Sequence, residues 1–228
     1  MFTHHQRLFL QHLSQYVTEH KKAIIEKVLS NRTRYLTIVL EDIYQSQNAS
    51  AVIRTCECMG LQDVHIVENS ARYSINRKVL KGADKWVTLH HYRDEQTDNQ
   101  TATCFKKLRS HGYRIVAASP DERCSSIHSL DLTQRVAIVM GNELNGLSSY
   151  AVENCDQRVT VPMYGFTGSM NISVSAALCI QSVMNRIRDS GIEISLDDDE
   201  KDMLRYNWYK RIVRRSHILE RQFLATIV

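Results

Sequence analysis

The segment Arg135-Val-Ala-Ile-Val-Met140-Gly141-Asn-Glu143-Leu-Asn-Gly146 decides the fold, because an apolar run typical of a buried strand ends directly in a polar, glycine-containing loop. Similar apolar runs of strand length recur at residues 36–40, 64–67, 113–118 and 158–161. Segments with the apolar spacing of helices separate these runs, so predicted strands alternate with predicted helices. The pattern predicts an α/β fold, with a mostly parallel sheet and helices on both faces.

Helical patterns occupy both ends of the chain as well as the intervals between strands. Residues 2–30 are expected to form one or two amphipathic helices, and residues 200–225 a single last helix after an acidic linker. Asn48 or Ser50 is placed to cap the helix that ends at Gly60. The remaining helices are expected at about residues 101–110, 149–155 and 170–189.

Three polar islands each follow an apolar strand: Asn48 to Thr55, Gly141 to Gly146 and Ser169 to Ser173. Each residue has an ordinary structural explanation, since Arg54 could be a solvated helical arginine, Asn48 a helix cap and Glu143 the start of a turn. Open α/β sheets, however, bind ligands at the carboxyl ends of their strands. The islands together therefore predict an enzyme site.

The glycine-containing loop before the third island could present backbone N–H and C=O groups to a nucleoside. Its small residues are equally suited to close packing of a helix on a sheet. The sequence contains neither a G-x-G-x-x-G motif nor a Walker lysine, so we exclude a Rossmann dinucleotide site and a P-loop.

Composition is that of a globular protein with one substantial core: 228 residues, of which 43% are hydrophobic and 24% charged. No apolar run is long enough to span a membrane and no secretion signal is recognisable, so we expect a cytoplasmic protein without a membrane partner. The six cysteines lack C-x-x-C spacing and are expected to be free, buried thiols. No metal site is predicted.

Positive charge is concentrated at the two ends of the chain. Residues 1–35 contain six Lys/Arg and two Asp/Glu, and residues 200–228 contain seven and three, whereas residues 36–199 contain sixteen and twenty. This distribution is typical of a protein whose ends hold a polyanion, although solvated helix faces would produce it equally well.

In order and spacing, the three islands resemble the three motifs of the SPOUT-class RNA 2′-O-methyltransferases, specifically the SpoU/TrmH family. Glu41-Asp-Ile-Tyr-Gln-Ser-Gln-Asn48 with Arg54-Thr resembles motif 1, Ile138-Val-Met-Gly141-Asn-Glu143 motif 2, and Val161-Pro-Met with Ser169-Met-Asn171-Ile-Ser-Val motif 3. The stretch Gly82-Ala-Asp-Lys85-Trp86-Val87 resembles the segment between motifs 1 and 2. The resemblance covers about residues 34–190.

The resemblance implies a C-terminal deep trefoil knot (the SPOUT, or alpha/beta knot, fold), a homodimer, and S-adenosyl-L-methionine as methyl donor. It implies three parts: a basic helical N-terminal extension (1–34), a methyltransferase domain (35–190), and a linker with a basic C-terminal helix (191–228). Carried over by position, the catalytic group is Arg54, Asn48, Glu143, Ser169 and Asn171. The cofactor contacts are Ser119, Gly141, Met163 and Ile172.

Within the family, the helical, basic extensions at both ends are most similar to those of the tRNA (guanosine-2′-O-)-methyltransferases, which act in the D-loop. Methylation of ribosomal RNA and a non-catalytic RNA-binding protein on the same scaffold are the alternatives. The expected phosphate-binding residues lie in the two extensions: Lys21, Lys22, Arg32, Arg34, Arg205, Lys210, Arg211, Arg214 and Arg215. Tyr206, Trp208 and Tyr209 could stack on bases or pack in a core.

The resemblance leaves two roles open for Arg54. A guanidinium normally stays protonated, so it would act as a general base only in a perturbing environment. Alternatively, it would hold the adjacent phosphate and lower the pKa of the 2′-hydroxyl. Ser169 and Asn171 are expected to shape the cofactor loop and orient Arg54, across a dimer interface if the chain forms a dimer.

Overall fold

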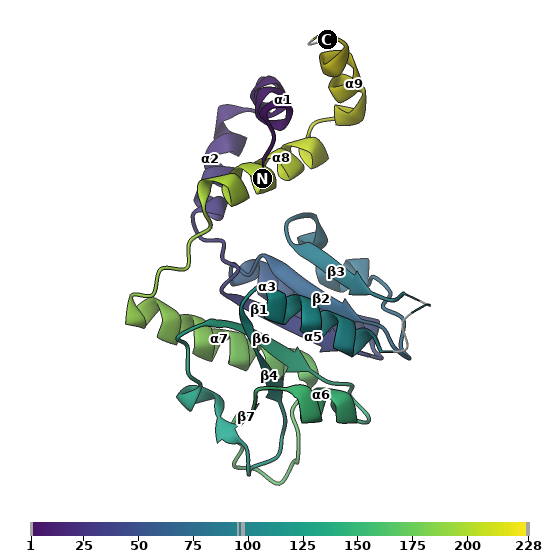
Figure 1. Ribbon diagram of the computed structural model, residues 1–228, viewed down its shortest axis with the longest axis vertical. Coiled ribbons are helices and arrows are strands. Elements are labelled where there is room, and N and C mark those ends of the chain that lie inside the picture. The colour runs from purple at the N-terminus through teal and green to yellow at the C-terminus, as the bar shows by residue number, and fades with distance from the viewer. Residues whose placement is uncertain (1, 95, 97–98, 227–228) are drawn as a thin grey trace. The chain divides into compact units, whose positions relative to one another are not determined.

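The structure, a computed structural model, describes residues 2–94, 96 and 99–226. It divides into a central unit, Arg34–Ile194, and a helical unit made of Met1–Thr33 and Ser195–Val228. The two ends of the chain, far apart in sequence, therefore belong to the same unit. Figure 1 shows the sheet of the central unit and the helices at either end of the chain.

A seven-stranded sheet in the order β3-β2-β1-β6-β4-β7-β5 forms the centre of the larger unit. Every pair of neighbouring strands is parallel, so the sheet is more uniform than the mostly parallel one predicted. The strands are β1 Leu36–Glu41, β2 Asp63–Val67, β3 Thr88–Tyr92, β4 Tyr113–Ala118, β5 Ser125–Ser126, β6 Arg135–Met140 and β7 Gln157–Thr160.

Helices cover both faces of this sheet, as the sequence predicts. Along β1, Ile38 and Leu40 pack with α3 (Ser46–Cys58) and α7 (Ile172–Ser190), whereas Val39 packs with α5 (Gln100–Ser110) and α6 (Ser149–Asn154). Because successive side chains of a strand point to opposite faces, a strand buried on both sides must be apolar throughout. This requirement explains the continuous apolar runs in the sequence.

Three short helical elements of the central unit have no strong signal in the sequence. The four-residue helix α4, Arg77–Leu80, and the 3-10 helix η1, Ala83–Lys85, both pack against α3. A second 3-10 helix, η2, spans Ile127–Ser129. Single turns contain too few residues to display helical periodicity, which is why the sequence does not predict them.

The helical unit contains α1 His4–Ser14, α2 Glu19–Leu29, α8 Asp198–Ile212 and α9 Ser216–Thr226. The single last helix predicted from the sequence is therefore wrong, because the chain breaks between α8 and α9, where Arg215 has a positive φ of 57°. Tyr206, Trp208 and Tyr209 are all buried in this unit. Core packing, the second alternative for these aromatics, is correct.

All six cysteines are free, and Cys56, Cys104 and Cys179 are buried. Burial raises the pKa of the Cys104 and Cys179 thiols to about 12, so both remain protonated at neutral pH. Cys58 is exposed, which corrects the expectation of burial for that residue. No helix among the described residues is long and apolar enough to cross a bilayer.

Candidate active site

The three islands meet at the carboxyl edge of the sheet. In the sheet, β2 and β3 lie on one side of β1, and the later strands lie on its other side, where β6 pairs with β1. Such a reversal separates the loops that follow two neighbouring strands and leaves a crevice between them. A cavity of about 730 Å³ lies there, lined by residues that follow β1, β4, β6 and β7. Its volume is within the range of about 300–1,000 Å³ usual for cofactor sites.

One hydrogen-bond chain joins the three islands at the edge of this cavity. The Asn48 side-chain amide donates to Glu143 Oε1 at 2.9 Å. The Asn171 amide donates in turn to Asn48 Oδ1 at 3.2 Å, while its own Oδ1 accepts from Ser173 N and caps α7. The side chains of Asn48, Glu143 and Asn171 thus link segments that lie about a hundred positions or more apart in the sequence.

Glu143 anchors this chain to the start of α3. Its Oε2 accepts from the backbone N–H of Tyr44 at 3.0 Å, and its Oε1 accepts from that of Gln45 at 3.4 Å. α3 begins at Ser46 after Gln45, which has no capping side chain, so the predicted caps Asn48 and Ser50 are wrong. A carboxylate at a helix N-terminus is favoured by the unsatisfied N–H groups and the helix dipole. Glu143 therefore replaces a local cap, and Asn48 is left to bond with Asn171.

We expect Glu143→Gln to lower the free energy of unfolding by about 1–3 kcal/mol, because an amide would place a donor against a donor at this helix terminus. Chemical denaturation measures the change. Glu153→Gln, on the exposed face of α6, is the matched control and is expected to alter stability by less than about 0.5 kcal/mol. Equal effects at the two positions would show that the network contributes nothing.

The loop after β6 has a backbone conformation that depends on Gly141. A Cβ built at this position would lie 2.4 Å from the carbonyl carbon of Gly146 and 2.4 Å from the Leu147 nitrogen, closer than any side chain tolerates. Asn142 and Gly146 close the loop by exchanging two backbone hydrogen bonds, at 2.8 and 2.9 Å. The loop folds back on itself, and all its residues from Gly141 to Leu147 line the cavity.

The structure brings most of the predicted site residues to this one cavity. The lining includes all four residues expected to contact the cofactor (Ser119, Gly141, Met163 and Ile172) and four of the five in the expected catalytic group (Asn48, Glu143, Ser169 and Asn171). Arg54 does not line it. The Arg54 side chain is exposed on α3 and forms no ion pair with any residue that the structure describes.

Sequence reasoning missed several polar residues that hold the site together. The Asn142 amide donates to the Asp42 carbonyl at 2.6 Å, and its Oδ1 accepts from Leu144 N at 2.8 Å. Glu41, only 1% exposed, accepts from both the backbone and the hydroxyl of Ser148, which caps α6. In the sequence, this role could have been inferred only from their position, because Glu41 and Asn142 stand at the ends of apolar runs.

The structure corrects part of the expected phosphate-binding set. Arg32 is 1% exposed and its guanidinium stacks on Trp208, 5.5 Å from the ring centroid, so it is a core residue of the helical unit. Arg34 belongs to the central unit and pairs with Asp63 at 2.8 Å. Burial raises the pKa of Asp63, but the His90 hydrogen bond and the Arg34 charge outweigh burial and lower it overall. Neither arginine presents a free charge to RNA.

The other expected phosphate-binding residues lie in the helical unit. Lys22 pairs with Glu19, Arg205 with Glu26, and Lys210 with Glu220. Arg211, Arg214 and Arg215 are exposed, and Lys21 is half-buried. Three of the expected phosphate-binding side chains are therefore paired with carboxylates of the same unit.

Comparison with known proteins identifies close relatives. The model of the SpoU rRNA Methylase family matches residues 35–181. A tRNA (guanosine(18)-2′-O)-methyltransferase of Borreliella burgdorferi is 42% identical over 208 residues, which cover 91% of this chain and 93% of that protein. The enzyme of the same name from Aquifex aeolicus is 26% identical, covering 87% of this chain and 93% of its own length.

Solved structures have the same architecture. The crystal structure of the Aquifex aeolicus TrmH/SpoU tRNA modifying enzyme superimposes with a TM-score of 0.75 at 25% identity, covering 86% of this chain and 98% of that one. AviRb from Streptomyces viridochromogenes, a SpoU methyltransferase in complex with the cofactor AdoMet, gives a TM-score of 0.59 at 20% identity, covering 72% and 65%. The likeness to AviRb shows the fold alone.

Proposed function

The chain belongs to the SpoU rRNA Methylase family, and from this premise we propose that it methylates the ribose 2′-hydroxyl of guanosine 18 in the D-loop of tRNA. The observation that carries the proposal is the match to a tRNA (guanosine(18)-2′-O)-methyltransferase over nearly the whole of both chains. The cavity where the three islands meet supplies the site.

S-adenosylmethionine is the methyl donor, and the cavity residues fit it. Ser119, Gly141, Met163 and Ile172 would hold the cofactor, and Gly141 lets the backbone of Gly146 and Leu147 occupy the place that a Cβ would take. When bound, the cofactor supplies a methyl group already activated by a sulfonium. The protein's own contribution is then to place the ribose hydroxyl in line and to help remove its proton.

Arg54 is the strongly basic side chain of the three islands, and we assign it to the target nucleotide. As proton acceptor it would contact the 2′-hydroxyl, and as a clamp it would contact the adjacent phosphate, so both roles require it to lie beside the target nucleotide. Asn48, Glu143 and Asn171 act as positioning residues that hold the loops of the site, and Ser169 shapes the cofactor loop.

A homodimer would bring Arg54 to a cavity. Arg54 is exposed and lies outside the cavity lining of its own chain, so a second protomer is the simplest source of a neighbouring site. On α7, Val174 and Leu178 are 48% and 37% exposed and stand one helical turn apart. This apolar strip on the helix that follows the third island supports a protein–protein interface there.

We also propose that the C-terminal part of the chain is threaded into a trefoil knot. It is supported by the family and by the path of the chain, because β7 pairs with β4 while the following helix α7 packs against α3 and β1. We further propose that residues 35–190 form the methyltransferase domain and that residues 1–34 and 191–228 assist RNA binding, with the exposed Arg214 and Arg215 among the contacts. A cytoplasmic location fits a tRNA substrate.

The test is incubation with labelled S-adenosylmethionine and separated tRNA and ribosomal RNA. We expect label in tRNA, mapped to the ribose of guanosine 18, and none in a transcript carrying 2′-deoxyguanosine at that position. If label appeared only in ribosomal RNA, the substrate would be ribosomal RNA and not tRNA. Absence of label in every RNA would leave a non-catalytic RNA-binding protein as the better explanation.

A further inference from the structure

A strongly basic segment lies within the central unit, where the overall charge is otherwise negative. Five of the sixteen Lys/Arg between residues 36 and 199 occur at positions 72–85, against the single acid Asp84. All five are exposed: Arg72, Arg77, Lys78, Lys81 and Lys85. Such a concentration of one sign of charge on one short segment attracts a polyanion.

Four of these cations are not neutralised within the protein. Arg77, Lys78, Lys81 and Lys85 form no ion pair or side-chain hydrogen bond with any of the described residues. By contrast, Lys22, Arg205 and Lys210 of the helical unit each pair with a carboxylate. Unpaired cations are thus concentrated on one short segment of the central unit, where the charge distribution along the sequence does not place them.

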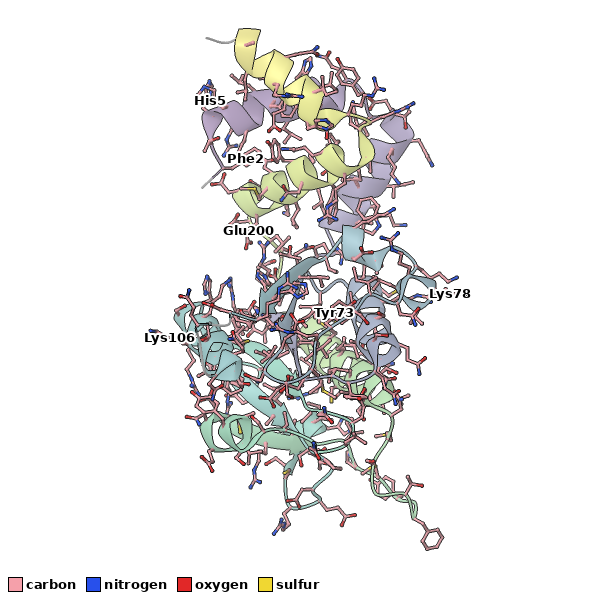
Figure 2. All side chains as sticks on the ribbon, turned by 90° about the vertical axis from the view of Figure 1, so that its right-hand side faces the viewer. Phe2, His5, Tyr73, Lys78, Lys106 and Glu200 are labelled. Atoms are coloured by element: carbon pink, nitrogen blue, oxygen red, sulfur yellow. The ribbon has the colours of Figure 1, made fainter. Side chains whose placement is uncertain are left out.

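The basic segment is anchored on the helix that bears Arg54. Leu80 and Ala83 are buried in the same apolar cluster as Val52 and Ile53 of α3. The Asn76 N–H donates to Ser50 Oγ at 3.1 Å, and Ser50 stands one helical turn before Arg54. The apolar side of the segment is therefore fixed on α3, and the Lys78 side chain points outward from the unit (Figure 2).

The backbone at Lys81 is unusual for a lysine. Lys81 has a φ of 52° and is the left-handed C-cap of α4, followed by Gly82 with a φ of 82°. Glycine or asparagine is the ordinary residue for this conformation. Backbone geometry thus gives no reason for lysine here, whereas a requirement for positive charge does.

We propose that Arg77, Lys78, Lys81 and Lys85 bind the phosphate backbone of the RNA substrate beside the nucleotide that Arg54 engages. This inference rests on the proposed function and names a substrate-binding surface in addition to the terminal extensions. Several exposed lysines and arginines on one short, anchored segment suit a phosphodiester chain, because they contact it without reading its bases.

The test is the fourfold variant Arg77→Gln, Lys78→Gln, Lys81→Gln, Lys85→Gln in the full-length protein. Each phosphate contact contributes about 0.7–0.9 to the slope of log K against log salt, so four lost contacts should lower the slope by about 3. Between about 50 and 200 mM salt, the wild type should then lose roughly 60-fold more of its tRNA affinity than the variant. The loss of activity should appear in KM for tRNA, with the dissociation constant of S-adenosylmethionine unchanged.

Two controls separate charge from structure. The charge-conserving variant Arg77→Lys, Lys78→Arg, Lys81→Arg, Lys85→Arg should retain the wild-type salt slope. Lys81→Asn alone should keep or raise the melting temperature, because asparagine suits the left-handed backbone, and yet weaken tRNA binding. A fourfold variant with wild-type slope and KM would overturn the proposal, even if methyl transfer to tRNA continued. Failure of the proposed function would instead appear as absent methyl transfer by the wild type.

Discussion

Arg54→Ala is expected to lower methyl transfer to tRNA by about 10²–10⁴-fold, the range for removal of a positioned acid–base or electrostatic group. Binding of S-adenosylmethionine should survive, because the Arg54 side chain lies outside the cavity lining and bonds to none of the described residues. Turnover is measured with labelled cofactor, and cofactor affinity by calorimetry.

Of two further variants, one tests the phosphate-clamp role of Arg54 and the other is a control. Arg54→Lys keeps the charge and should recover part of the activity if the side chain clamps a phosphate, since lysine binds phosphate as a point charge. Arg135→Ala removes an exposed arginine at the opposite end of the sheet and should leave turnover unchanged. Wild-type turnover by Arg54→Ala would remove this residue from the reaction.

Gly141→Ala is expected to weaken binding of S-adenosylmethionine by about 10- to 100-fold. The added Cβ would lie 2.4 Å from backbone atoms of Gly146 and Leu147, so the loop must move. Overpacking of this kind costs about 1–3 kcal/mol, which corresponds to the stated loss if the displaced loop is the cofactor-bound one. Calorimetric titration with the cofactor measures the effect directly.

The control for Gly141→Ala is Gly165→Ala, at a loop position where a Cβ would meet no atom within 4 Å. We expect its cofactor affinity to change by less than about threefold. If Gly141→Ala bound S-adenosylmethionine as tightly as the wild type, the loop after β6 would not form the cofactor site.

The sequence predicted the sheet because its strands are buried on both faces and hence continuously apolar, as in β1 and β6. It predicted that the three islands meet because polar segments at the ends of parallel strands lie at one edge of the sheet, whereas Ser119 and Met163 were implied by the family resemblance alone. It could not predict that Glu143 caps α3, since the cap is nearly a hundred residues away from the helix in sequence. Local patterns pointed instead to Asn48 or Ser50.

Counts of charge along the sequence did not predict which basic side chains are buried or paired. They assigned the phosphate contacts to the chain ends, but Arg32 is buried against Trp208 and Arg205 pairs with Glu26. They also concealed the unpaired cations of residues 77–85 within a segment of net negative charge. Pairing depends on side chains distant in sequence, which composition does not contain.

The central claim is that Arg54 of one protomer serves the cofactor cavity of the other. It is tested by a mixed dimer, purified with two different tags, of one Arg54→Ala chain and one Gly141→Ala chain, assayed below the wild-type dissociation constant of S-adenosylmethionine so that the Gly141→Ala cavity stays nearly empty. If the site is shared, the Arg54→Ala chain contributes an intact cavity and its partner an intact arginine, and one of two equivalent sites should work, giving about half the wild-type turnover. A mixed dimer as inactive as both parent variants would contradict the claim.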